Sequence, residues 1–172
     1  MKYFVILFLL STFSGFGQVR TKSTTPKPTF SIEKISEGIC IRNIAMSSFF
    51  SLIAGSAWGF HEGTQHHWSK FQKKFPDANP NYWNPEISWK NKYRNGNPEE
   101  GEKFYGSSTV FVAITDAKHL LSFIHRGSLI GTGICLTIGE KKPLKHYLIG
   151  GVANAISFGI GFTFAYDWIY KL

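Results

Sequence analysis

The chain of 172 residues has 19 lysine and arginine residues against 11 aspartate and glutamate residues, a formal net charge of +8. Its 16 phenylalanine, 7 tyrosine and 5 tryptophan residues are too much apolar surface to leave in water, which excludes disorder over most of the chain. The 2 cysteine residues and the lack of a glycine period of three exclude disulfide-rich and collagen-like proteins. The length suits one domain, or a membrane bundle with one large loop.

The first segment predicts export. Met1 and Lys2 give a positive start, residues 3–14 form an apolar run of 12 residues, and small residues precede Gln18. Such a run is too short to cross about 30 Å of hydrocarbon at about 1.5 Å of rise per residue. We therefore predict a secretory signal peptide over residues 1–17, with an uncleaved anchor as the alternative. The predicted location is the bacterial cell envelope, at the inner membrane.

Residues 18–42 predict a connection that precedes the core. Residues 19–31 are rich in threonine, lysine and proline, which is typical of an extended, solvated linker. In residues 32–42, isoleucines occur among charged side chains at a spacing that favours a short amphipathic helix. A single membrane-associated domain is expected to follow over residues 43–172.

Apolar stretches predict a mainly α fold, a small helical membrane bundle. Residues 43–60 and 147–166 contain no charged side chain, and residues 118–138 are mostly apolar. Each stretch is long enough for a membrane helix, although a buried helix of a soluble protein suits residues 43–60 nearly as well. Three apolar helices result, or four if residues 107–138 form a helical hairpin. A β-barrel needs more strands of about ten residues than this chain supplies beside its polar insertion.

Small residues recur at every fourth position within these stretches. The series are Gly55 and Gly59, then Gly127, Gly131, Cys135 and Gly139, then Gly151, Ala155, Gly159 and Thr163. Glycine costs about 1 kcal/mol inside a water-exposed helix. In lipid, small residues let helix backbones approach closely, so the spacing favours helix packing in a membrane.

Residues 61–106 differ in kind, because they hold seven basic and six acidic residues, four prolines and three tryptophans. Proline and glycine are too frequent there for a long helix. Aromatic residues among lysines can stack on nucleic-acid bases, but behind an export signal a folded loop at a membrane surface is favoured. The predicted partners are therefore membrane lipids, together with a second copy or an envelope complex, and not nucleic acid.

The block HEGTQHH over residues 61–67 holds three candidate metal ligands, Glu62, His66 and His67. In a helix, Glu62 and His66 are four residues apart and share a face. Imidazole and carboxylate groups are common ligands of zinc and non-haem iron, so zinc or iron is the cofactor that this block would hold. The spacing H-E-x-x-x-H turns the second histidine by about 100° from its place in H-E-x-x-H zinc proteases, which excludes that class.

Asp116 and His119 are the candidate catalytic residues. They are three residues apart at the start of an apolar stretch and would share one helical face. A carboxylate can orient an imidazole as a general base, and ionisable groups in a membrane segment usually face a site or a partner. The alternative is structural, namely that Asp116 neutralises Lys118 or Arg126.

The segment WNPEISWKNKYRNG at 83–96, together with the histidine block and TDAKH at 115–119, resembles a group of exported membrane proteins from Bacteroidetes-type bacteria. This resemblance implies a location and no particular reaction. Asp116 followed by His119 at the start of a span is also similar to VanZ-like small membrane proteins. The histidine here stands one residue closer than in that family's usual pattern.

Two functions follow from these features. The first is a multi-pass envelope membrane protein with a structural role, or a role as an interaction partner in a complex. The second is a small membrane enzyme that acts on a lipid or lipid-linked substrate through the histidine block and the Asp116 and His119 pair. A soluble periplasmic domain that binds a ligand through its tryptophan-rich loop is a third, weaker hypothesis.

Overall fold

The computed structural model describes residues 38–171, which form helices joined by loops, with one isolated bridge between Tyr93 and Glu102 in place of a sheet. Three helices are long, namely α3 (Ile41–His66), α7 (Ala117–Thr137) and α8 (Leu144–Tyr170). The elements between α3 and α7 are α4 (Trp68–Lys74), α5 (Pro80–Trp83), α6 (Pro85–Ser88) and the 3-10 turns η1 (Trp89–Lys92), η2 (Arg94–Gly96), η3 (Pro98–Glu100) and η4 (Val112–Ile114). The predicted mainly α fold is confirmed.

The three long helices coincide with the three predicted apolar stretches. Residues 107–116 make turns and η4 before α7 begins, so they do not form the first arm of a helical hairpin. The described residues therefore contain three long helices and not four, and two of these, α7 and α8, are candidate membrane spans by length and composition. The predicted signal peptide, residues 1–17, and the predicted linker up to residue 37 lie outside the described residues.

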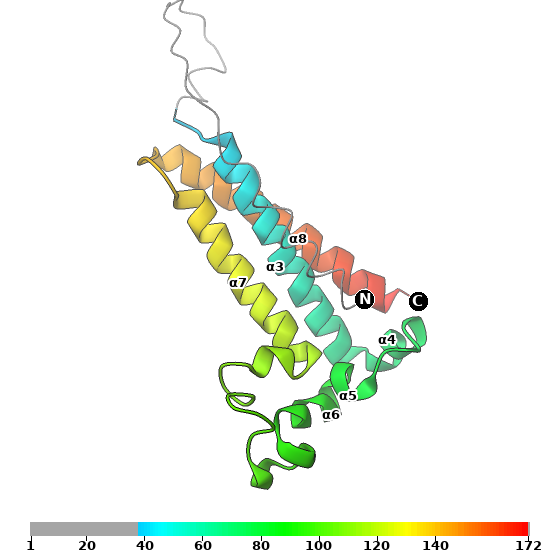
Figure 1. The fold of residues 1–172 in the computed structure, drawn as a ribbon. Helices are drawn as coiled ribbons and strands as arrows, with labels where there is room; N and C mark the ends of the chain where they lie inside the picture. The colour runs from blue at the N-terminus through cyan, green and yellow to red at the C-terminus, as the bar shows by residue number, and fades with distance from the viewer. Residues whose placement is uncertain (1–37, 172) are drawn as a thin grey trace, which may run out of the picture. The chain divides into compact units, whose positions relative to one another are not determined.

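Helix α3 packs against both α7 and α8, which make few contacts with each other (Figure 1). Helices α3 and α8 run parallel, because their contacts advance along both helices together, from Ser47 with Asn154 to Gly63 with Ile169. Helix α7 runs antiparallel to α3 and begins at the C-terminal end of α3 (Figure 1). The first and the last long helices of residues 38–171 are thus direct neighbours.

Gly55 and Gly59 are points of close approach between α3 and α8. A Cβ atom on Gly55 would lie 2.1 Å from the carbonyl oxygen of Phe158, and one on Gly59 would lie 2.4 Å from that of Phe162. The predicted packing role of these two glycines is confirmed. The two glycines of the spaced series in α8, in contrast, have open space where a Cβ atom would lie.

Polar side chains fill another part of the α3–α8 contact. The side-chain oxygen of Asn154 accepts hydrogen bonds from the hydroxyls of Ser47 (3.0 Å) and Ser48 (3.1 Å). The Ser51 hydroxyl donates to the backbone carbonyl of Asn154 at 2.7 Å. Ser47, Ser51 and Asn154 are buried. Small and polar residues therefore hold the two helices together, as is common between membrane helices.

A buried histidine, His146 in the first turn of α8, connects the N-terminal end of α3 with the C-terminal end of α7. The Nδ1 atom of His146 accepts the backbone N–H of Cys40 at 3.3 Å, and Nε2 donates to the carbonyl of Leu136 at 3.1 Å. Beside it, the side-chain amide of Asn43 donates to the carbonyl of Ile138 at 2.8 Å. These bonds satisfy backbone groups near the ends of helices, which helical hydrogen bonds leave free.

Large apolar side chains face outward. Helices α7 and α8 are each long and apolar enough to cross a membrane by length and composition, yet only 6% of the apolar part of α7 and 22% of that of α8 is buried. The core helix of a soluble protein would be mostly buried. The exposed large apolar residues on or beside these helices are Phe123, Leu129, Ile130, Ile134, Ile138, Leu144, Leu148, Ile149, Val152, Ile156, Ile160, Phe164 and Trp168.

Candidate functional site

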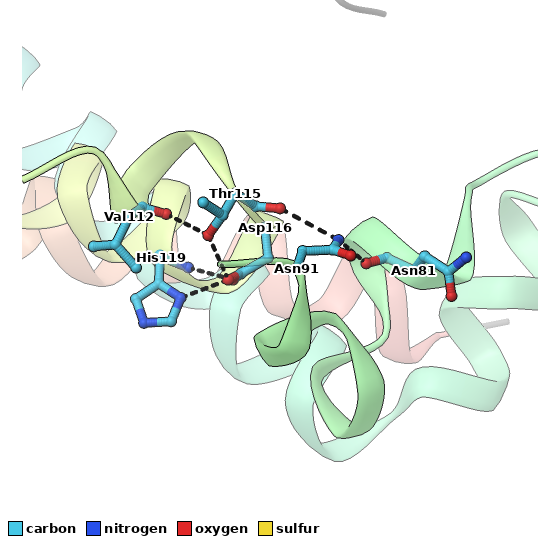
Figure 2. Close-up of polar contacts among 6 residues, drawn as sticks. All are labelled: Asn81, Asn91, Val112, Thr115, Asp116 and His119. Atoms are coloured by element: carbon cyan, nitrogen blue, oxygen red, sulfur yellow. Dashed lines mark hydrogen bonds and ion pairs between the residues drawn. The ribbon is translucent and has the colours of Figure 1, made fainter. Parts of the chain in front are cut away.

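Asp116 and His119 meet at the start of α7 (Figure 2). The Oδ2 atom of Asp116 lies 2.6 Å from Nδ1 of His119, and Oδ1 accepts the backbone N–H of His119 at 2.9 Å. The hydroxyl of Thr115 also lies within hydrogen-bond distance of Oδ2, at 3.2 Å. The Asp116 side chain is fully buried, whereas 31% of the His119 side chain is exposed. The predicted pairing of these two residues on one helical face is confirmed.

The local sequence explains why this pair forms. Asp116 has an extended backbone and stands just before α7, where its carboxylate accepts one of the free N–H groups of the first turn. The positive end of the helix dipole also favours a negative charge there. The preceding loop holds this cap, because the Asn91 side chain donates to the carbonyl of Thr115 at 3.3 Å and to that of Asn81 (Figure 2).

The charge of the Asp116 carboxylate affects the pKa of Tyr82 in α5. Burial raises the pKa of the Tyr82 phenol, and the Asp116 carboxylate raises that pKa further because it would repel a phenolate. Both effects favour the neutral, protonated form of the phenol. The effect of Asp116 on Tyr82 was not evident from the sequence, because the rest of the polar loop separates α5 from α7 in the chain.

The pair is arranged for proton transfer. When the Nδ1–H of His119 donates to the carboxylate, Nε2 keeps its lone pair. Nε2 points away from Asp116 (Figure 2). Such an imidazole can accept a proton from a substrate, or bind a metal ion while the carboxylate orients the ring. Among the ion pairs within residues 38–171, Asp116 has His119 as its partner and does not pair with Lys118 or Arg126.

The predicted metal ligands are brought together only in part. Glu62 and His66 share a face as predicted, with 3.2 Å between Oε2 and Nε2, and the other oxygen of Glu62 lies 3.2 Å from Nδ1 of His61. His67 faces α8 instead, where its Nε2 lies 2.8 Å from the Tyr166 hydroxyl. Within residues 38–171, no three histidine, cysteine, aspartate or glutamate side chains gather in a way that could hold a metal ion.

Aromatic contacts connect α3 and α7 at the first residue of the histidine block, His61. The ring of Trp58 stacks on His61 with 4.7 Å between centroids, and it lies 4.9 Å from the ring of His125. Nδ1 of His125 also lies 3.0 Å from the carbonyl oxygen of Ala54. The spacing of Trp58 and His61 was a local signal for half of this stack, but nothing in the sequence indicated which histidine of α7 completes it.

The chain matches no protein-family model, no curated protein and no solved structure.

Proposed function

We propose that this chain is an integral membrane protein of the bacterial cell envelope, located in the inner membrane. Its long helices α3, α7 and α8 would form a three-span bundle with a structural or interaction role. The observation that carries this proposal is the reversed distribution of polarity. Serine, asparagine and glycine lie inside the bundle, while leucine, isoleucine, valine and phenylalanine cover its outside.

That distribution is unfavourable in water. Burial of apolar surface stabilises a soluble protein by about 25 cal/mol for each Å², so its largest apolar side chains belong inside. In lipid the preference is removed, and polar contacts with close backbone packing hold helices together instead. The spans of 21 and 26 residues in α7 and α8 are also long enough for about 30 Å of hydrocarbon.

The interaction role follows from the amount of uncovered apolar surface. Helix α3 covers one side of α7 and one side of α8, and these two helices do not cover each other along most of their length. Their outer faces therefore need lipid or the helices of other membrane proteins. The basic turn between α7 and α8, with Lys141, Lys142 and Lys145, lies where anionic headgroups would be.

We expect the wild-type protein to remain with membranes after an alkaline carbonate wash and to need detergent for extraction. A charged residue at the centre of α8, Ile156→Arg, should reduce insertion at a cost of about 2.5–3.5 kcal/mol. The matched control is Glu99→Arg, an exposed residue of η3, which should insert like the wild type. Recovery of the wild type in the soluble fraction would contradict the proposal.

The Asp116–His119 pair supports a second candidate function, a membrane enzyme that acts on a lipid or lipid-linked substrate. His119 would accept a proton from the substrate through Nε2, and Asp116 would hold the imidazole in the required tautomer and orientation. The pair lies at the start of a proposed span, so its substrate would be reached from the membrane surface.

This second function predicts a lipid product that depends on His119. Lipid extracts of cells that express the wild type, His119→Ala or Glu99→Ala as their only copy are compared by mass spectrometry. The product should be present with the wild type and with Glu99→Ala, an exposed residue of η3, and should be lost with His119→Ala. Identical lipid profiles in all three strains, at equal protein levels, would rule out this enzymatic role.

A further inference from the structure

Residues 104–114, which lead from the polar loop to α7, expose an unusual set of apolar side chains. Tyr105 is 92% exposed, Val110 is 77% exposed and Ile114 is 63% exposed, and Phe104 and Phe111 are also exposed. Single exposed apolar residues are common in soluble proteins, but five within eleven consecutive residues form a patch. This patch needs a physical explanation.

Several polar groups in and beside the same segment are hydrogen-bonded within the loop. Ser107 is fully buried, and its hydroxyl donates to the carbonyl of Lys92 at 2.7 Å. The Glu102 carboxylate accepts the N–H of Gly106 at 2.9 Å, the N–H of Ser108 at 3.4 Å and the Ser108 hydroxyl. These hydrogen bonds hold the pKa of Glu102 below its ordinary value, so the carboxylate stays ionised at neutral pH.

Part of the segment's backbone is also hydrogen-bonded internally. The carbonyl of Gly106 accepts hydrogen bonds from the N–H groups of Thr109 at 3.1 Å and Phe111 at 2.8 Å. The carbonyl of Phe111 accepts a hydrogen bond from the N–H of Ile114 at 3.1 Å. Gly106 has a positive φ of 74°, which permits this tight turn without strain. A loop that bonds several of its polar groups internally while it exposes large apolar side chains suits a surface that offers few hydrogen bonds.

The charged residues beside the segment indicate which surface this is. Lys103 immediately precedes it and is exposed, and Lys118 follows it in the first turn of α7. Cations beside apolar and aromatic side chains fit the boundary between lipid phosphates and acyl chains. The segment also continues into α7, where Phe123 is 67% exposed on the outer surface.

We propose that residues 104–114 lie in the headgroup region of the bilayer, with Val110, Phe111 and Ile114 in contact with the upper acyl chains. This inference rests on the proposed membrane location, and adds that the loop before α7 is itself a lipid-binding element. Lys103 then lies at the level of the lipid phosphates. The start of α7, with Asp116 and His119, is held at the membrane surface.

The test is depth-dependent fluorescence quenching in the full-length protein. Cys40→Ser and Cys135→Ser provide a background into which a single cysteine is placed at Val110, Ile156 or Glu99 and labelled with an environment-sensitive dye. All three side chains are exposed, so the label displaces no packed contact. The protein is reconstituted into phosphatidylethanolamine–phosphatidylglycerol vesicles with nitroxide quenchers in the headgroup or in the middle of the acyl chain.

We expect the label at 110 to be blue-shifted and to lose most emission with the headgroup quencher. The label at 156 should lose most emission with the acyl-chain quencher, and the label at 99 should respond to aqueous iodide alone. If the acyl-chain quencher acts on the label at 156 while iodide alone quenches the label at 110, the loop inference is overturned and the membrane proposal stands. Shielding of 110 from both lipid quenchers and iodide would indicate a protein partner and would also overturn it. Absence of lipid quenching at 156 would instead overturn the membrane proposal.

Discussion

Gly55→Ala is expected to separate α3 from α8 and to lower the free energy of unfolding by about 3 kcal/mol. The added methyl group would lie 2.1 Å from the carbonyl oxygen of Phe158, and backbone cannot move aside as a flexible side chain can. Restoring a normal distance requires α8 to shift, which also weakens the hydrogen bonds between Asn154 and the serines of α3. The measurement is denaturant unfolding of the purified protein in detergent micelles.

Gly159→Ala is the matched control for this prediction. Gly159 directly follows Phe158 on the same helix but faces away from α3, since a Cβ atom there meets nothing within 4 Å. The same chemical change should therefore alter the free energy of unfolding by less than about 1 kcal/mol. Equal losses for the two variants would mean that helix propensity, and not the close approach of α3 to α8, determines the effect.

His146→Ala is expected to lower the free energy of unfolding by about 3 kcal/mol. The change opens a cavity at a fully buried position and removes the partners of the Cys40 N–H and the Leu136 carbonyl. Because His146 connects the residue before α3 with the end of α7, hydrogen exchange should increase in both segments. Unfolding in micelles and amide exchange followed by mass spectrometry measure the two effects.

His146→Gln and His66→Ala distinguish the hydrogen bonds from general effects of the substitution. Glutamine has one acceptor and one donor and should recover part of the lost stability. His66 is 58% exposed and pairs with Glu62 at the surface, so its removal should change the free energy of unfolding by less than about 1 kcal/mol. A loss for His146→Ala no greater than that for His66→Ala would contradict the proposed role of His146.

The sequence predicted the long helices well, because uninterrupted apolar stretches and small residues at four-residue spacing are local signals. The predicted positions of the helix ends were less accurate. The predicted stretch 43–60 stops six residues before α3 does, since α3 continues through the polar block to His66. Hydropathy reports where lipid-compatible side chains end, whereas a helix continues until its hydrogen bonds stop.

The polar loop contained signals that composition alone did not use. Asn79, Asn84 and Asn97 each precede a proline, and each accepts a hydrogen bond from the N–H two residues later, at the start of α5, α6 and η3. An asparagine cap followed by proline in the first turn starts a helix. High proline content excluded one long helix correctly, but the Asn-Pro pairs also predict several short ones.

The candidate site was predictable where its contacts are local. Asp116 and His119 are three residues apart, so helical geometry sufficed. His67 was assigned with Glu62 and His66, but it lies at the break between α3 and α4, where the direction of its side chain depends on the turn and not on helical spacing. Its partner Tyr166 is 99 residues away in the chain, and such contacts follow from the packing of α3 on α8.

The parallel contact of α3 and α8 has a consequence for biosynthesis. Of the three long helices described, α3 is made first, and its packing surface carries Ser47, Ser51 and two glycines that find their partner only in α8. In the proposed membrane location, this polar surface would face lipid or the insertion machinery until α8 has left the ribosome. A chain that stops before residue 144 therefore leaves α3 without its partner, and we expect such a product to be degraded by membrane proteases.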